Sequence, residues 1–183
     1  MLLGIDLGGT KIEGIVLKSR ENPEEVIRHR VNTEEEKGYS QVISNIKSLV
    51  DYIESNINHK FSRLGIGTPG TIDPESGLLK NSNSQCLNGM PIQKDLSKVL
   101  DKTILIQNDA NCFALAETLI GSVKDQHPNA RNVFGIIMGT GVGGGVIIDG
   151  KTIYGSQGIG GEWGHTIVTD SGDECYCGKR GCV

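Results

Sequence analysis

IDLGGTK, residues 5–11, sets a carboxylate, two glycines, a hydroxyl and a lysine between two apolar runs, residues 2–7 and 12–17. The runs have a β-like composition and predict two strands joined by a glycine turn. Backbone amides can approach an anion closely where no Cβ intervenes, and the hydroxyl and the ammonium add donors. The turn therefore predicts a phosphate-binding loop. An ordinary glycine hairpin is the alternative for this loop taken alone.

Six further segments are predicted to be strands or helices. From Val42 to Ile57 the apolar residues recur at spacings of three and four, which predicts one face of an amphipathic helix. The predicted elements after the turn are strands at 26–31, 63–67 and 103–107 and helices at 42–57, 91–100 and 109–119. The order βββαβαβα matches the ribonuclease-H-like, actin-like α/β core, although other α/β folds would also suit it.

A second glycine-rich stretch, MGTGVGGGVIIDG (residues 138–150), repeats the design of the first loop. It covers most of the second half of a predicted hairpin, residues 133–148, with which a second domain of the same type begins. The expected domains are residues 1–121 and 122–183. The stretch lacks the lysine-serine end of a P-loop and starts a hairpin rather than a helix, so Walker and Rossmann loops are both excluded on context.

Two such loops facing each other would form a clamp for a nucleotide's phosphates. In the first loop Asp6 is placed to hold Mg²⁺ directly or through water. The residues predicted to bind the nucleotide cofactor are Asp6, Gly8, Gly9, Thr10, Lys11, Gly139, Thr140, Gly141 and Gly143.

Between the two loops, the stretch QNDANCFALAE (residues 107–117) puts Asp109 at the end of a predicted strand and the start of a helix. Capping the helix is the commonest role of aspartate at such a position. The carboxylate could also take the proton of an alcohol during phosphoryl transfer, which requires an oriented hydroxyl, a neutralised phosphate and a base. Asp109 is therefore the candidate catalytic residue.

The overall composition is that of a globular protein, with 37% hydrophobic residues, 22% charged residues and a formal net charge of −4. Lysine and arginine are scattered, which argues against nucleic acid as a partner. The N-terminus lacks the pattern of a signal peptide, and no apolar run is long enough to cross a bilayer. We expect a soluble cytoplasmic protein without a membrane partner.

Three of the five cysteines gather near the end of the sequence in CYCGKRGC, residues 175–182. The spacing Cys-x-Cys-x4-Cys offers three thiolates, Cys175, Cys177 and Cys182, and His165 is near enough to be a fourth ligand. This set predicts a tetrahedral zinc site, with free thiols or a redox pair as the alternatives. The isolated Cys86 and Cys112 are expected to be packing residues.

Taken together, the motifs resemble the ROK group of bacterial sugar kinases, and most closely its fructokinase or mannokinase branch. DLGGTK, GIGTPG, LKNSNSQCLNG, NDANCFALAE, GTGVGGG, GEWGH and CYCGKRGC stand in family order and cover nearly the whole chain. The resemblance implies an actin-like ATPase fold, ATP with Mg²⁺, a hexose substrate, a structural Zn²⁺ and a homodimer.

The resemblance also assigns roles to residues of this chain. Asp109 becomes the catalytic base, and the residues implied to bind the sugar are Gly70, Asn83, Asn108, Asp109, Glu162 and His165. His165 would then have two roles, one ring nitrogen on zinc and the other turned towards the sugar.

The leading hypothesis is an ATP-dependent hexose kinase that transfers the γ-phosphate to a sugar hydroxyl, by resemblance the 6-hydroxyl. The alternative is a non-catalytic sugar-binding or regulatory ROK protein, or an inactive fragment. In the family the last cysteine is followed by a sugar-binding glutamate and a further part of the protein, so a chain that ends at Val183 is expected to be shortened.

Overall fold

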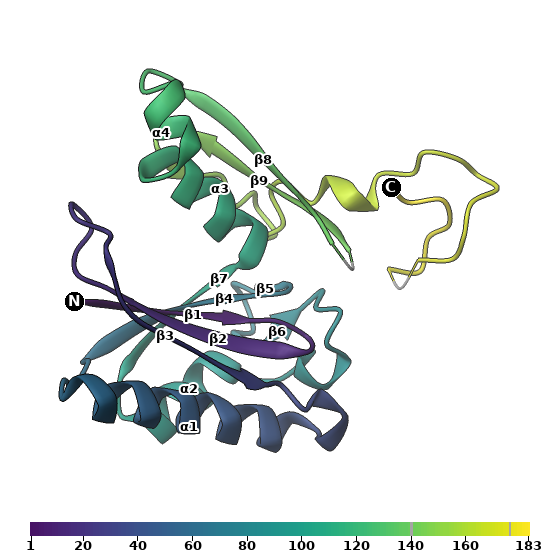
Figure 1. Ribbon diagram of the computed structural model, residues 1–183. Coiled ribbons are helices and arrows are strands. Elements are labelled where there is room, and N and C mark those ends of the chain that lie inside the picture. Colours follow the sequence, from purple (N-terminus) through teal and green to yellow (C-terminus); the bar gives the residue numbers. More distant parts are fainter. Residues whose placement is uncertain (140, 176) are drawn as a thin grey trace. The chain divides into compact units, whose positions relative to one another are not determined.

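The computed structural model describes residues 1–139, 141–175 and 177–183 (Figure 1). Contacts between residues divide the chain into two compact units, Met1–Asn108 and Asp109–Val183. No helix among the described residues is long and apolar enough to cross a membrane.

The first unit is built on a five-stranded sheet in the order β3-β2-β1-β4-β7. The first three strands pair antiparallel, whereas β4 and β7 run parallel to β1. All five strands were predicted. Their observed bounds are Leu2–Leu7 for β1, Lys11–Leu17 for β2, Glu25–Asn32 for β3, Arg63–Thr68 for β4 and Thr103–Asn108 for β7.

Two helices cover one face of this sheet, α1 (Tyr39–Ile57) and α2 (Ile92–Leu100), and lie together on that face in Figure 1. The apolar stripe of α1 supplies much of the core, because Ile46, Leu49 and Ile53 are fully buried. Both predicted helices are confirmed, but Pro91 lies just before α2 as its N-cap residue instead of within its first turn.

A two-stranded hairpin that the sequence analysis did not predict follows β4. It joins β5 (Thr71–Ile72) to β6 (Leu79–Lys80), and a short 3-10 helix, η2 (Gln85–Leu87), follows. Strands of two residues are too short to show an alternating pattern, which explains why the sequence did not reveal them.

The second unit begins with α3 (Asp109–Leu119) and a short helix, α4 (Ser122–Gln126). A three-stranded antiparallel sheet follows, with β8 (Asn132–Met138), β9 (Val142–Ile148) and β10 (Lys151–Thr152) in the order β10-β9-β8. This confirms the predicted hairpin. α3 packs on β8 and β9 within this unit. The compact units therefore do not coincide with the expected domains, because a boundary after Gly121 would separate α3 from the hairpin on which it packs.

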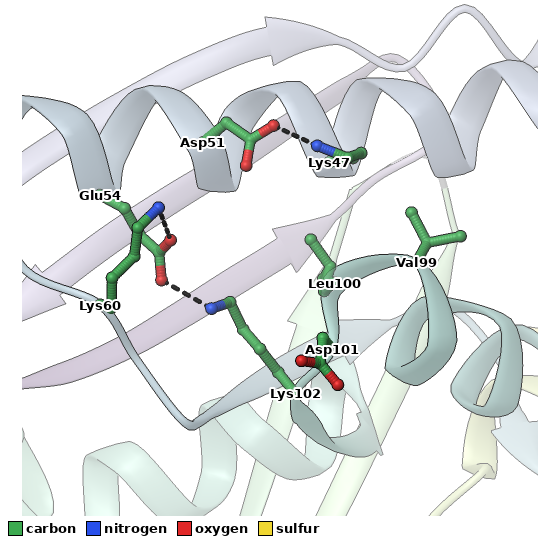
Figure 2. Close-up of a pocket in the computed structure, with 8 residues that line it drawn as sticks. All are labelled: Lys47, Asp51, Glu54, Lys60, Val99, Leu100, Asp101 and Lys102. Atoms are coloured by element: carbon green, nitrogen blue, oxygen red, sulfur yellow. Dashed lines mark hydrogen bonds and ion pairs between the residues drawn. The ribbon is translucent and has the colours of Figure 1, made fainter.

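A buried carboxylate links the C-terminal part of α1 to the segment that leads into β7. Glu54 is 2% exposed, and its Oε1 accepts hydrogen bonds from the Phe61 amide and the Lys102 ammonium, both at 2.8 Å. Its Oε2 accepts one from Lys60 at 2.8 Å. Glu54, Lys60 and Lys102 line a pocket of about 320 Å³ beside α1 (Figure 2). Each oxygen of Glu54 accepts a hydrogen bond from the protein itself, so this carboxylate needs no ligand. We therefore assign the pocket a structural role.

Candidate functional site

The glycine loop between β1 and β2 is held as a tight turn by backbone bonds. The Gly8 amide donates to the Lys11 carbonyl at 3.0 Å, and a Cβ on Gly8 would lie 3.1 Å from that carbonyl oxygen. Thr33, at the end of β3, donates its hydroxyl to the Gly8 carbonyl at 2.6 Å and its amide to the Thr10 carbonyl at 3.0 Å. The loop is therefore fixed from two sides before any ligand binds.

The polar groups around this loop are accessible. Asp6, Thr10 and Lys11 are all exposed. Partial desolvation and then the Glu13 carboxylate, which lies opposite on β2, raise the pKa of Asp6 above its ordinary value, while Arg30 on β3 lowers it. The arrangement leaves a carboxylate, a hydroxyl and an ammonium available at one turn, as an anion and its cation require.

Sequence analysis missed one residue beside this loop, Glu35. Both of its carboxylate oxygens lie 3.8 Å from the point that a Cβ on Gly9 would occupy, and the Ser84 hydroxyl lies 3.4 Å from the same point. Among the described residues, Glu35 Oε2 is a buried atom without a hydrogen-bond partner. The run of three glutamates at residues 34–36 was the only sequence signal, and such runs usually face solvent.

Two of the predicted sugar residues of the first unit meet through a hydrogen bond. The Asn108 side-chain amide donates to the Gly70 carbonyl at 3.1 Å, and Asn108 is buried. Gly70 has a φ of 80°, and a Cβ there would lie 2.3 Å from the Lys80 carbonyl oxygen. Only glycine can hold this close approach to β6, so Gly70 has a structural role whatever it binds.

Asn83 lies in the segment that follows β6. It is exposed between Ser82 and Ser84, which are both buried. Asn88 fixes this segment, because its side chain accepts from the Ser82 amide at 2.9 Å and donates to the Ser82 carbonyl at 2.8 Å. The Asn83 side chain is thereby presented to solvent on a rigid turn.

In the second unit the structure brings together Asp109 and Glu162. Asp109 begins α3, and its Oδ1 accepts the amide of the next residue, Ala110, at 2.8 Å, so its carboxylate contacts the backbone at the start of the helix. Burial, and then the negative charge of Asp109, raise the pKa of Glu162 above its ordinary value. Two carboxylates that disfavour each other's ionisation are a common feature of sites that move protons.

Glu162 and His165 are positioned by η3 (Trp163–His165), which packs closely on β9. The Trp163 indole donates to the Gly143 carbonyl at 3.0 Å. A Cβ on Gly164 would lie 2.0 Å from the Val142 carbonyl oxygen, so the helix can approach the strand only with glycine there.

The glycines of the β8–β9 hairpin fall into two groups. Gly139 and Gly141 have open space where a Cβ would stand, and the Gly139 amide donates to the Gly141 carbonyl at 2.9 Å. At Gly143 a Cβ would lie 3.3 Å from the Cβ of Ala110, and at Gly145 it would lie 2.7 Å from the Ala110 carbonyl oxygen. Gly139 and Gly141 therefore leave space for a ligand, whereas Gly143 and Gly145 allow β9 to pack on α3. Thr140 lies outside the described residues.

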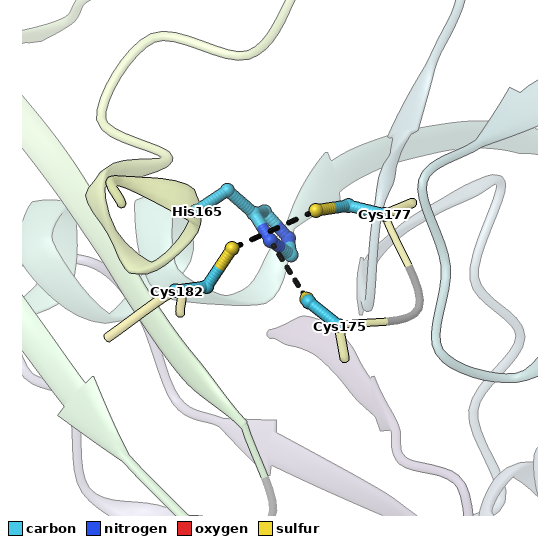
Figure 3. Close-up of side chains that lie close together, drawn as sticks. All are labelled: His165, Cys175, Cys177 and Cys182. Atoms are coloured by element: carbon cyan, nitrogen blue, oxygen red, sulfur yellow. Dashed lines mark hydrogen bonds between the residues drawn. The ribbon is translucent and has the colours of Figure 1, made fainter. Parts of the chain in front are cut away.

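The four predicted zinc ligands converge (Figure 3). One ligand atom from each of His165, Cys175, Cys177 and Cys182 lies within 4.8 Å of the others. The Sγ atoms of Cys177 and Cys182 are 3.7 Å apart, and Cys175 Sγ is 3.5 Å from His165 Nδ1.

These distances fit a metal. Tetrahedral zinc with ordinary bond lengths separates two sulfurs by about 3.8 Å and a sulfur from a nitrogen by about 3.6 Å. None of the five cysteines forms a disulfide. The donor set and its spacing therefore suit a closed tetrahedral ion through His165 Nδ1.

Comparison with known proteins identifies the family of the chain. The profile of the ROK family matches residues 2–183. The chain is 37% identical to an N-acetyl-D-glucosamine kinase of Aliivibrio fischeri over 193 aligned positions, which cover 100% of the chain and 61% of that protein. It is 35% identical to a glucokinase of Thermotoga maritima, covering 100% of the chain and 55% of that protein.

Among solved structures, a ROK family glucokinase from Streptomyces griseus in complex with glucose and AMPPNP superposes with a TM-score of 0.82 at 28% identity. The match covers 99% of the chain and 55% of that structure. The fold and the site residues define an α/β protein of the actin-like ATPase type. The chain belongs to the ROK family, and it spans about 60% of the length of the curated relatives named here.

Proposed function

We propose that this chain supplies the sugar-binding and phosphate-binding residues of an ATP-dependent hexose kinase. Family membership over residues 2–183 supports the class of reaction. The observation that carries the proposal is the electrostatic coupling of Glu162 to Asp109 at the start of α3. Asp109 accepts the proton of the attacking sugar hydroxyl, and Glu162 orients a neighbouring hydroxyl.

The remaining residues of the proposed reaction bind and orient. Asn108, Asn83 and His165 hydrogen-bond sugar hydroxyls, with the Gly70 carbonyl fixing Asn108. Gly8, Gly9, Thr10 and Lys11 donate to phosphate oxygens from their loop, and the open tip at Gly139 and Gly141 does so from its hairpin. Mg²⁺, when bound, neutralises the charge of the transferred phosphoryl group. Asp6 and the orphaned buried oxygen of Glu35 are carboxylates that suit a hard cation.

We also propose a structural Zn²⁺ held by His165 Nδ1 and the three cysteines. Zinc at that nitrogen leaves His165 Nε2 for a sugar hydroxyl, and the closed loop fixes the ring's orientation. The homodimer stays a prediction, which light scattering of the purified protein would check.

The preferred hexose is the open part of the proposal. The motif resemblance favours the fructokinase branch with 6-phosphorylation, whereas the relatives named above carry the names N-acetyl-D-glucosamine kinase and glucokinase. ADP release should therefore be measured with glucose, N-acetylglucosamine, mannose and fructose at equal concentration. Phosphate transfer to at least one of them is the expected result, and NMR of the product identifies the phosphorylated hydroxyl.

Sugar binding without ADP release from any hexose would support the alternative, a non-catalytic sugar-binding or regulatory protein. If the chain showed neither sugar binding nor turnover, both proposed functions would be contradicted.

A further inference from the structure

Glu35 is held beside the glycine loop by a specific local structure. Thr33 ties the end of β3 to Gly8 and Thr10, as described above. The next residue, Glu34, has a φ of 55°, and Lys37, Gln41 and Asn45 all hydrogen-bond its carboxylate. This left-handed turn places the side chain of the next residue, Glu35, beside Gly9.

The described surroundings of Glu35 offer no hydrogen-bond donor to one of its two carboxylate oxygens. Ser84 is the nearest polar side chain at the Gly9 position, and among the described residues Oε2 has no hydrogen-bond partner. The negative charge of Glu35 also acts on Cys86, because burial and then this charge raise the pKa of the Cys86 thiol. Glu34 is satisfied by its own partners and Glu36 is exposed, so the orphaned carboxylate is a property of Glu35 alone.

A bare carboxylate at this place opposes the proposed function of the loop. A carboxylate only accepts hydrogen bonds, and it repels the phosphate that Gly8, Gly9 and Thr10 would bind. A hydrated divalent cation resolves both problems, because its waters donate to the carboxylate while its charge offsets the repulsion. Magnesium typically keeps several waters and is held by one or two carboxylates together with substrate phosphates.

We propose that Glu35 is a positioning residue for the divalent cation that accompanies phosphate at the Gly8–Thr10 loop, acting through cation-bound water. The inference rests on the proposed function, because it assumes that this loop binds phosphate. Glu35 would thus act together with Asp6, which lies on the strand that leads into the loop.

The test is ATP binding by calorimetry, with and without Mg²⁺, in the wild-type chain, Glu35→Gln and the control Glu36→Gln. With Mg²⁺, Glu35→Gln should weaken ATP binding by roughly 10- to 100-fold, the usual effect of losing an outer-shell partner. Without Mg²⁺, the same change should leave the affinity equal or raise it, because a repelling charge is gone. Glu36→Gln should match the wild type in both conditions.

The contrary outcomes are distinct. Equal loss or equal gain in both conditions would overturn the role of Glu35, since the carboxylate would then act without the cation. A wild-type chain that binds no ATP in either condition would contradict the proposed function of the loop, and the inference with it.

A second measurement guards against misfolding. In metal-free buffer Glu35→Gln should unfold at the same or a higher temperature than the wild type, because a partly buried carboxylate with one buried oxygen that lacks a donor loses its charge. A lower unfolding temperature would show that the protein itself satisfies Glu35, and would overturn the inference.

Discussion

Asp109 combines a structural task with its proposed chemical one. Its Oδ1 accepts the Ala110 amide at the start of α3, and its charge raises the pKa of Glu162. Asparagine keeps the size of the side chain and an oxygen for the Ala110 amide, but it cannot take a proton. The two roles can therefore be separated by one substitution.

If the proposed kinase activity is present, we expect Asp109→Asn to lower turnover by about two to four orders of magnitude, the range of a positioned general base. The unfolding temperature should change little, because the cap survives. Steady-state ADP release and a thermal melt measure the two effects. Near-normal turnover in this variant would mean that Asp109 is only a helix cap.

The hairpin glycines also differ residue by residue, although the sequence presents them as one run. A Cβ on Gly145 would meet the Ala110 carbonyl oxygen at 2.7 Å and the Ala114 Cβ at 2.9 Å, whereas a Cβ on Gly141 meets nothing within 4 Å. One added methyl group should therefore act on folding at the first position and on ligand binding at the second.

Gly145→Ala is expected to cost about 1–3 kcal/mol of unfolding free energy, since α3 must move away from β9. Gly141→Ala should leave stability unchanged, and a bulkier Gly141→Val should weaken ATP binding by blocking close approach of the backbone. Denaturant unfolding and calorimetry give the two values. If Gly145→Ala proved as stable as Gly141→Ala, the packing account of β9 would be wrong.

At the scale of elements, the segment that contains η3 and the cysteines has little regular structure of its own. It is held by isolated bridges between Ile167 and Cys182 and between Glu174 and Arg180. A metal site of this kind contributes its binding energy to local folding. The order of this segment should therefore depend on the ion.

Purified under reducing conditions without chelator, the chain should carry about one zinc per molecule, as a closed Cys3His site requires. Cys177→Ser should release the metal and speed amide exchange between residues 161 and 182, while Cys112→Ser, on α3, keeps it. Elemental analysis and hydrogen exchange test this. Zinc-free wild-type protein would defeat the metal assignment. In the active kinase, zinc loss without a rise in the Michaelis constant for sugar would reject the link between His165 and substrate.

At the scale of the whole molecule, stability depends on a few buried charges as well as on the apolar core. The side chains of Lys102 and Glu54 are 10% and 2% exposed, whereas that of Lys60 is 75% exposed. Burial raises the pKa of Glu54, but the hydrogen bonds from Lys102, Lys60 and the Phe61 amide together leave it below its ordinary value of 4.5. The stability from this carboxylate is thus present above about pH 4.5 and is lost as the pH falls through the lower folded pKa.

Lys102→Met should lower the unfolding free energy by about 3 kcal/mol at neutral pH, because it leaves a buried carboxylate without its main partner. The exposed control Lys60→Met should cost less than about 1 kcal/mol. The deficit of Lys102→Met should shrink as the pH falls through the lowered pKa of Glu54 in the folded wild type, because that carboxylate then takes up a proton and the ion pair is lost. Urea unfolding at several pH values measures this. A deficit that stays constant with pH would rule out the ion pair as its cause.

Most elements of the fold were determined by the sequence itself. The apolar stripe on α1 has the helical period, and β1, β2 and β3 are apolar runs of β-like composition, so the order and type of these elements were predicted correctly. The convergence of His165, Cys175, Cys177 and Cys182 was also predicted, because their spacing along the chain is short. The strands β5 and β6 were missed, since two residues carry no period.

The tertiary structure alone decided which glycines pack and which stay open, and which acidic residue lies unpaired beside a loop. Gly141 and Gly145 look alike in sequence, and only the approach of α3 to β9 distinguishes them. Glu35 looks like its exposed neighbour Glu36, and only the turn at Glu34 directs it under Gly9. Periodicity reports burial along one element. These roles depend instead on the distance between separate elements, which the residue pattern of a single element does not encode.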